Sequence, residues 1–200
     1  MRRQIAIWAL LLGVGLVTAC SSSGQSVKQW SSAPAMVIDP NKQYSASIRT
    51  NLGDLQVDLL AKDTPNTVNN FVFLARNGFY DGSKFHRVIN EFMVQTGDPT
   101  GSGRGGPGYQ IVDEPVIGSY DRGVLAMANT GRPNTAGSQF FIVQGASVTL
   151  PKTYTIFGKV TEGMDVVDKI AAVPVAAAPT GELSVPQQEV RIEKVTINER

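Results

Sequence analysis

Two segments of the chain place polar side chains beside large apolar ones in a pattern that indicates ligand binding. In the first, Arg87 alternates with Phe85 and Ile89, so the three are expected on one face of a strand. An arginine in such a place can also lie along a surface with its charged end in water. In the second segment Gln139 and Phe141 share a strand face. A polar amide beside an aromatic ring suits a core poorly unless a ligand uses both groups.

The residues around these two segments form one candidate binding patch. Its apolar members are Phe92, Met93 and Phe141, and its polar members are Arg87, Gln95, Asn129 and Gln139. Polar amides and a guanidinium around an apolar centre suit an uncharged, partly apolar ligand that carries amide groups.

Two other motifs carry less weight. Gly101–Gly106 matches the spacing of a dinucleotide-binding loop, but Pro107 follows and no helix begins there, so a mobile surface loop is the simpler interpretation. Ser138 lacks the flanking residues of a nucleophile elbow, and its only candidate partner is the chain's one histidine, His86. A lone histidine is more often a buried structural group than a catalyst. The motifs therefore favour neither a nucleotide site nor a Ser–His hydrolase.

Composition excludes several classes of protein. The 200 residues include 18 Lys and Arg against 17 Asp and Glu, so the chain lacks the basic field of a nucleic-acid binder. A hydrophobic content of 42% excludes wholesale disorder. One cysteine and one histidine exclude an intramolecular disulfide, a four-cysteine zinc site and a paired-histidine metal site. We therefore expect no metal and no cofactor.

The N-terminus has the pattern of an export signal. Arg2 and Arg3 precede 13 uncharged residues, Ile5–Val17, which are too few to span a bilayer comfortably. The following Val-Thr-Ala-Cys resembles a bacterial lipoprotein box, in which the leader is cut before the cysteine and Cys20 receives palmitate and other acyl chains. An ordinary secretory signal cut after Ala19 is the alternative. The resemblance implies a lipid-anchored protein of the cell envelope on the extracytoplasmic side, and Ser21 favours the outer membrane if the cell has one.

The sequence thus divides into three parts. Residues 1–19 are the expected lipoprotein signal peptide, residues 20–40 the lipidated cysteine with a flexible Ser-, Gln- and Ala-rich tether, and residues 41–200 the folded domain. Without the leader the formal net charge is −1, which gives no attraction to an anionic membrane. Acyl chains would therefore have to hold the protein there, since each buried CH₂ is worth about 0.8 kcal/mol.

Hydrophobic periodicity predicts a mainly β domain with two helices. Apolar and polar residues alternate in residues 44–50 and again in 54–59, on either side of a turn, which predicts a β-hairpin. Thr64 is expected to cap a helix that begins at Pro65 and ends at Gly78. Further strands are expected at 84–89, 92–95, 109–112, 123–128, 139–143 and 155–160, a second helix at 162–172, and a last strand at 189–198 with a bulge near Glu193. Residues 173–188 receive no element. We expect a closed eight-stranded antiparallel β-barrel capped by two α-helices.

Three stretches together resemble the cyclophilin family of peptidyl-prolyl cis–trans isomerases. They are Phe85-His86-Arg87 with Phe92-Met93-Val94-Gln95, the loop that ends Gly137-Ser138-Gln139-Phe140-Phe141, and Tyr154–Val160. The likeness runs from about Tyr44 to Ile197. The family fold is an eight-stranded barrel with two capping helices, which agrees with the elements above.

The resemblance implies a role for each residue of the patch. Arg87 would be the catalytic arginine. The substrate-binding residues would be Phe92, Met93, Gln95, Ala128, Asn129 (through its backbone), Gln139, Phe141, Leu150 and Tyr154. Partners would be proline-containing polypeptides, bound by a monomer. Many family members carry Trp and His where this chain has Thr149 and Tyr154, and loss of the Trp is expected to weaken cyclosporin binding.

Two rival functions stay open at this point. A cyclophilin-like module or chaperone could bind proline-containing segments with little catalysis. Thr149, which replaces the Trp of many family members, is compatible with this function. A lipocalin-like carrier would need an open barrel cavity, against which the large apolar residues on every strand argue.

Overall fold

The described part of the chain folds into ten strands and two helices. The structure is a computed structural model that describes residues 27–146 and 148–200; the expected signal peptide and Cys20 lie outside these residues. The elements are β1 (Tyr44–Thr50), β2 (Gly53–Leu59), α1 (Pro65–Arg76), β3 (Arg87–Ile89), β4 (Met93–Thr96), β5 (Val124–Met127), β6 (Phe140–Val143), β7 (Ile156–Glu162), α2 (Met164–Ala171), β8 (Val175–Ala177), β9 (Leu183–Pro186) and β10 (Ile192–Glu199).

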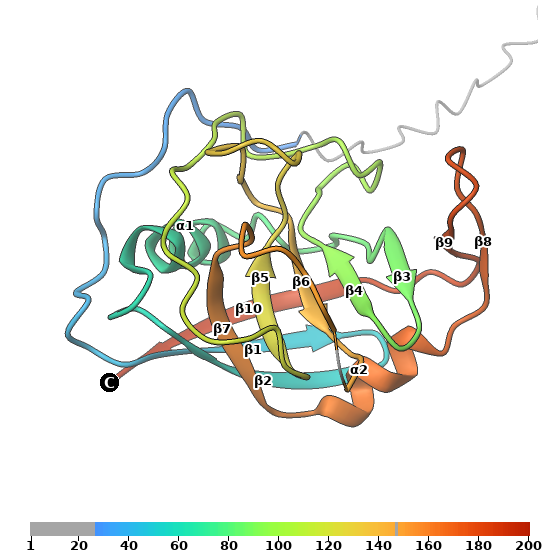
Figure 1. The fold of residues 1–200 in the computed structure, drawn as a ribbon. Coiled ribbons are helices and arrows are strands. Elements are labelled where there is room, and N and C mark those ends of the chain that lie inside the picture. The colour runs from blue at the N-terminus through green and yellow to red at the C-terminus, as the bar shows by residue number, and fades with distance from the viewer. Residues whose placement is uncertain (1–26, 147) are drawn as a thin grey trace, which may run out of the picture.

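Eight strands form one antiparallel sheet in the order β10-β1-β2-β7-β5-β6-β4-β3, which curls into a half-barrel (Figure 1). The eight-stranded, mainly β prediction is confirmed, but the expected closure is overstated. The edge strands β3 and β10 form no ladder in the described chain. The chain before β3 meets the start of β10 and the residues that precede it. The Ile192 amide donates to the Ser83 carbonyl at 2.8 Å, Lys84 bridges Arg191, and the Phe85 amide donates to the Val190 carbonyl at 2.9 Å. The predicted bulge is confirmed, because Glu193 has no partner between the Arg49–Lys194 and Thr50–Ile192 pairs.

The interior is filled by large side chains rather than open. The fully buried residues include Phe71 of α1, Phe140 of β6 and Phe157 of β7. Their rings pack edge-to-face or tilted, with centroids 5.3–6.0 Å apart. A filled interior removes the argument for a carrier with a central cavity.

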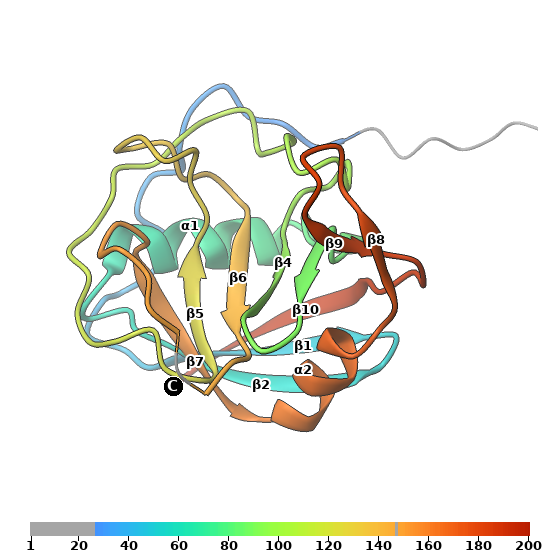
Figure 2. The same cartoon turned by 45° about the vertical axis from the view of Figure 1, so that its right-hand side comes forward.

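The two helices lie toward opposite ends of the half-barrel (Figure 2). Helix α1 begins after Thr64 as predicted, but the Thr64 hydroxyl donates to the Leu60 carbonyl and does not cap the helix. The carboxylate of Glu114 does so instead, accepting from the Asn66 and Thr67 amides at 3.0 and 2.8 Å. A carboxylate at a helix N-terminus satisfies free amides and complements the helix dipole.

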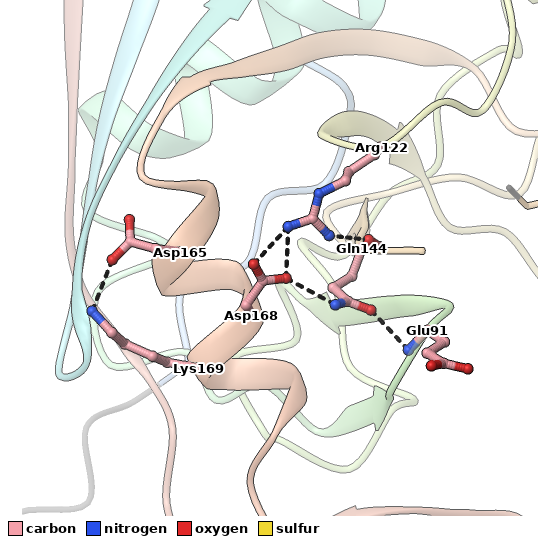
Figure 3. A network of polar contacts seen from close by, with 6 residues as sticks. All are labelled: Glu91, Arg122, Gln144, Asp165, Asp168 and Lys169. Atoms are coloured by element: carbon pink, nitrogen blue, oxygen red, sulfur yellow. Dashed lines mark hydrogen bonds and ion pairs between the residues drawn. The ribbon is translucent and has the colours of Figure 1, made fainter. Parts of the chain in front are cut away.

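A group of polar side chains, here called the polar clamp, joins α2 to the chain before β5, the chain after β6 and the β3–β4 turn (Figure 3). Its members are Arg122, Gln144 and Asp168. The Arg122 guanidinium donates to both oxygens of Asp168 on α2, at 2.7 and 2.6 Å. The Gln144 side chain donates to Asp168 at 2.8 Å and accepts from the Glu91 amide at 2.8 Å. The clamp therefore fixes the β3–β4 turn immediately before Phe92.

Residues 27–40, which belong to the expected tether, contact the domain at several points. Trp30 lies against Phe73 and Phe79, with ring centroids 5.2 and 5.8 Å apart, and its amide donates to the Pro107 carbonyl at 2.8 Å. Further along, the Val37 amide donates to the Asn69 side chain at 2.7 Å. Apolar side chains within this polar segment find partners on α1, a contact that composition alone did not indicate.

The glycine-rich loop at residues 101–108 is likewise held in place. The buried Asp98 carboxylate accepts from the amides of Thr100 and Gly105 at 2.7 and 3.0 Å. A Cβ on Gly108, whose φ is +92°, would lie 2.6 Å from the Trp30 carbonyl oxygen. Glycine at this position thus lets the N-terminal segment lie against the loop.

Two further differences concern strands. The expected strand at 109–112 is a loop with a single bridge, between Ile111 and Ala136. The unassigned residues 173–188 hold a hairpin, β8–β9, which stands beside β3 (Figures 1 and 2). In the described part of the chain, no helix has the length and apolar character needed to cross a membrane.

Candidate functional site

Strand register brings the predicted site residues into one row. Arg87 of β3 pairs with Gln95 of β4, Gln95 pairs with Phe141 of β6, and Phe141 pairs with Ala126 of β5. Directly paired residues of antiparallel strands share a face, with Cβ atoms about 4.5–5.5 Å apart. A cation, an amide and an aromatic ring therefore stand side by side on the outer face of the half-barrel. Phe85, expected on the face of Arg87, lies before β3 and is buried in the main core.

A cavity of about 220 Å³ opens over this row. It is lined by Arg87, Phe92, Met93, Gln95, Ala128, Asn129, Phe141, Leu150 and Tyr154. The catalytic and substrate-binding residues named from the sequence, Gln139 excepted, thus meet around one hollow. Its volume lies below the range of about 300–1,000 Å³ that is usual for drug-sized ligands, so it suits a single small ring or side chain.

The apolar part of the cavity is a second, smaller core. Phe141 packs edge-to-face on Tyr154 with centroids 5.6 Å apart, and Met93 is buried beneath. The Tyr120 hydroxyl donates toward the Tyr154 carbonyl at 3.0 Å and so fixes the segment that carries Tyr154. These side chains are held before any ligand arrives, which lowers the entropy cost of binding.

The guanidinium of Arg87 makes a two-bond fork with Glu182, which precedes β9. Nε and Nη2 donate to Oε1 and Oε2, both at 2.7 Å. Hydrogen bonding from Arg87 lowers the pKa of Glu182 from 4.5 to about 2. Both side chains are just over a third exposed, so the pair contributes only about 0–1 kcal/mol to stability. Sequence reasoning missed Glu182 because it lies in the segment that received no element.

The remaining nitrogen of Arg87 begins a chain of amides. Nη1 lies 3.4 Å from Gln95 Oε1 and 3.8 Å from Met93 Sδ. Gln95 Nε2 donates to Gln139 Oε1 at 3.0 Å, and Gln139 Nε2 donates to the Gly105 carbonyl at 2.9 Å. A guanidinium can only donate, so it orients both amides in turn.

Gln139 lines a second, wider hollow of about 840 Å³, and its partner Gln95 lines both hollows. The wider hollow is bounded by the 103–110 loop, the segment around Thr130 and Gln29 of the N-terminal segment. Ala128 and Asn129 line both hollows. The Asn129 side chain donates to the Thr153 carbonyl and accepts from the Gly131 amide, which leaves its backbone for a ligand.

Three other sequence observations have a place in the structure. Thr149 is exposed next to Leu150, at the edge of the small cavity. His86 packs behind the glycine-rich loop beside Gly103, and burial lowers the pKa of its imidazole, so it is neutral at physiological pH. Among residues 27–146 and 148–200, no three His, Cys, Asp or Glu side chains gather as metal ligands would.

Comparison with known proteins agrees with this geometry. The family model described as "Cyclophilin type peptidyl-prolyl cis-trans isomerase/CLD" matches residues 45–197. Peptidyl-prolyl cis-trans isomerase B of Streptomyces anulatus is 42% identical over 178 residues, which are 80% of this chain and 99% of that protein. The human protein named peptidyl-prolyl cis-trans isomerase-like 3 is 42% identical over 159 residues, 77% of this chain and 96% of that one.

Solved structures give the same result. A cyclophilin type peptidyl-prolyl cis-trans isomerase of Cryptosporidium parvum has a TM-score of 0.71 at 34% identity, covering 80% of this chain and 99% of that chain. Its structure in the presence of the dipeptide Ala-Pro has a TM-score of 0.70 at 35% identity, covering 78% and 99%.

Proposed function

This chain belongs to the cyclophilin-type peptidyl-prolyl cis–trans isomerases, and from that membership we propose that it accelerates rotation about X–Pro bonds in exported or envelope proteins, with Arg87 as the catalytic residue. The observation that carries the assignment of Arg87 is its place at the wall of a proline-sized apolar cavity, with Nη1 beside Gln95 and Met93.

The chemistry needs no covalent bond to the protein. An amide bond resists rotation by about 18–20 kcal/mol because twisting breaks its resonance, and uncatalysed X–Pro exchange takes tens to hundreds of seconds. In the twisted state the proline nitrogen regains a lone pair and accepts a hydrogen bond. A guanidinium stays charged and can donate there without giving up its proton. The bond accelerates rotation because it forms in the twisted state and not in the planar one.

The other residues of the cavity would hold the substrate while the bond turns. Phe92, Met93, Phe141 and Leu150 would clamp the proline ring, and Tyr154 would close the rim. Gln95 and the Asn129 backbone would hold peptide groups on either side of the ring. Gln139 and Ala128 would line the adjoining groove, in which the chain before the proline would lie.

A binding module with little catalysis is the second candidate. The observation that favours it is the pairing of two Arg87 nitrogens with Glu182, which reduces the field that the guanidinium exerts on a ligand. A protease-coupled assay on a short X–Pro peptide separates the two functions. Acceleration above the uncatalysed rate supports the isomerase, whereas saturable peptide binding without acceleration supports the module and contradicts our proposal.

The cellular location is a separate proposal. We propose that Cys20 is acylated and holds the protein on the extracytoplasmic side of a bacterial membrane. Trp30, which packs on the domain, lies ten positions after Cys20, and at most about 3.6 Å per position gives a reach of about 36 Å. Incorporation of labelled palmitate into the wild type and not into Cys20→Ser supports the anchor; equal labelling, or none, contradicts it.

We also propose that Thr149 weakens cyclosporin binding and that the protein is a monomer.

A further inference from the structure

The β8–β9 hairpin carries Glu182, which holds Arg87 from outside the eight-stranded sheet. The turn is closed by the Ala178 amide, which donates to the Glu182 carbonyl at 2.7 Å, and by the Gly181 amide, which donates to the Ala178 carbonyl at 2.8 Å. The hairpin packs against β3, the strand on which Arg87 lies (Figure 2). A turn fixed at both its ends therefore presents the Glu182 carboxylate to the guanidinium.

The two hydrogen bonds to Glu182 leave Nη1 of Arg87 facing the small cavity. Glu182 takes Nε and Nη2, while Nη1 lies toward Gln95 and Met93, both of which line the small cavity. Glu182 is not among the described residues that line that cavity, so it holds the arginine from behind and does not block the site. An arginine side chain has several rotatable bonds, and a bidentate carboxylate selects one arrangement of them.

We propose that Glu182 is a positioning residue that aims Nη1 of Arg87 at the proline cavity. This inference rests on the isomerase function proposed above. Binding of the proline ring depends on the apolar walls, whereas stabilisation of the twisted bond depends on where Nη1 lies. Loss of the fork should therefore lower the turnover rate and leave peptide affinity nearly unchanged.

The test compares Glu182→Gln with a matched control. Glutamine keeps the size of the side chain and one acceptor, but it loses the charge and places an NH₂ group against a donor. Glu199→Gln removes the same charge from β10, outside the cavity, where the carboxylate contacts Lys42 Nζ and Arg76 Nη2, each at 2.8 Å. We expect Glu182→Gln to lower kcat about five- to tenfold with less than a twofold change in peptide Kd, and Glu199→Gln to behave as wild type.

Two further measurements distinguish positioning from a structural effect. The NMR resonance of the Arg87 Nε–H should lose its hydrogen-bonded shift in Glu182→Gln while amide signals of β1, β2 and β7 stay in place. In an Arg87→Ala background, adding Glu182→Gln should lower kcat no further. An additional loss in that background would mean that Glu182 acts by another route and would overturn the inference.

The outcomes test the role of Glu182 separately from the proposed isomerase function on which it rests. A wild type without isomerase activity defeats the proposed function. An active wild type with an equally active Glu182→Gln variant leaves the function standing and defeats the inference. A faster Glu182→Gln variant would show that the hairpin restrains Arg87, and this too would overturn the proposal.

Discussion

The Arg87 guanidinium and the Glu182 carboxylate, 95 residues apart in the chain, form a bidentate pair with two 2.7 Å hydrogen bonds at the wall of the small cavity. The pair joins an edge strand of the sheet to a hairpin that belongs to a separate two-stranded sheet. The site therefore depends on a segment outside the eight-stranded sheet.

The first prediction concerns the acidity of Glu182. Its pKa is lowered to about 2, chiefly by hydrogen bonds from Arg87. The pair's contribution to stability is thus complete above the ordinary value of 4.5 and is lost as the pH falls through about 2. A carboxyl-detected NMR titration should place the Glu182 midpoint near 2 in the wild type and near 4.5 in Arg87→Ala. A midpoint that does not move would mean that the pair does not form in solution.

Trp30 should stabilise the domain although it lies in the N-terminal segment. It makes two aromatic contacts, with Phe73 and Phe79, and such pairs are worth about 0.5–1.5 kcal/mol each. Trp30→Ala is expected to lower the free energy of unfolding by about 1–3 kcal/mol in urea denaturation. Limited proteolysis should then cut the segment before Ile38 faster. Unchanged stability would support the flexible tether that composition suggests.

The Arg122–Asp168 clamp should contribute modestly to stability. The Asp168 side chain is about half-exposed, and its pKa is lowered by hydrogen bonds from Arg122 and Gln144. We expect Asp168→Asn to cost about 0.5–1 kcal/mol. The control is Asp165→Asn on the same helix, which loses a pair only with the exposed Lys169 (Figure 3) and should change stability less. A larger effect of the control would contradict the clamp.

The same clamp should matter for the cavity, because it holds the turn before Phe92. Asp168→Asn is expected to raise the peptide Kd about twofold while kcat changes less, since Phe92 lies on the wall that grips the ring. Titration of a proline-containing peptide followed by calorimetry measures this. Unaltered affinity would show that the turn keeps its place without the clamp.

Local patterns were enough to predict most of the half-barrel. The β1–β2 hairpin and α1 have clear apolar periods, and the phase change in the last strand correctly predicted the bulge at Glu193. The cavity residues were named from motifs that resemble a known family, and the structure gathers them around one hollow. Their individual roles stay predictions.

What the sequence did not reveal depends on contacts between distant segments. Six of the twelve residues from Val175 to Pro186 are Ala, Pro or Gly, which have low strand propensity, so the local signal for the β8–β9 hairpin was weak. Trp30 stands between the polar residues Gln29 and Ser31, and only the position of α1 shows where it packs. The open edge between β3 and β10 likewise depends on register, which no strand pattern specifies alone.

The central claim is that Arg87 stabilises the twisted X–Pro bond, and isomerase turnover of Arg87→Ala tests it most directly. Removal of a preorganised donor should lower kcat/KM about 10²–10³-fold, with circular dichroism and urea unfolding as in the wild type. A loss below about threefold in a folded variant, which corresponds to less than about 0.7 kcal/mol of transition-state stabilisation, would contradict the account and assign catalysis to other groups.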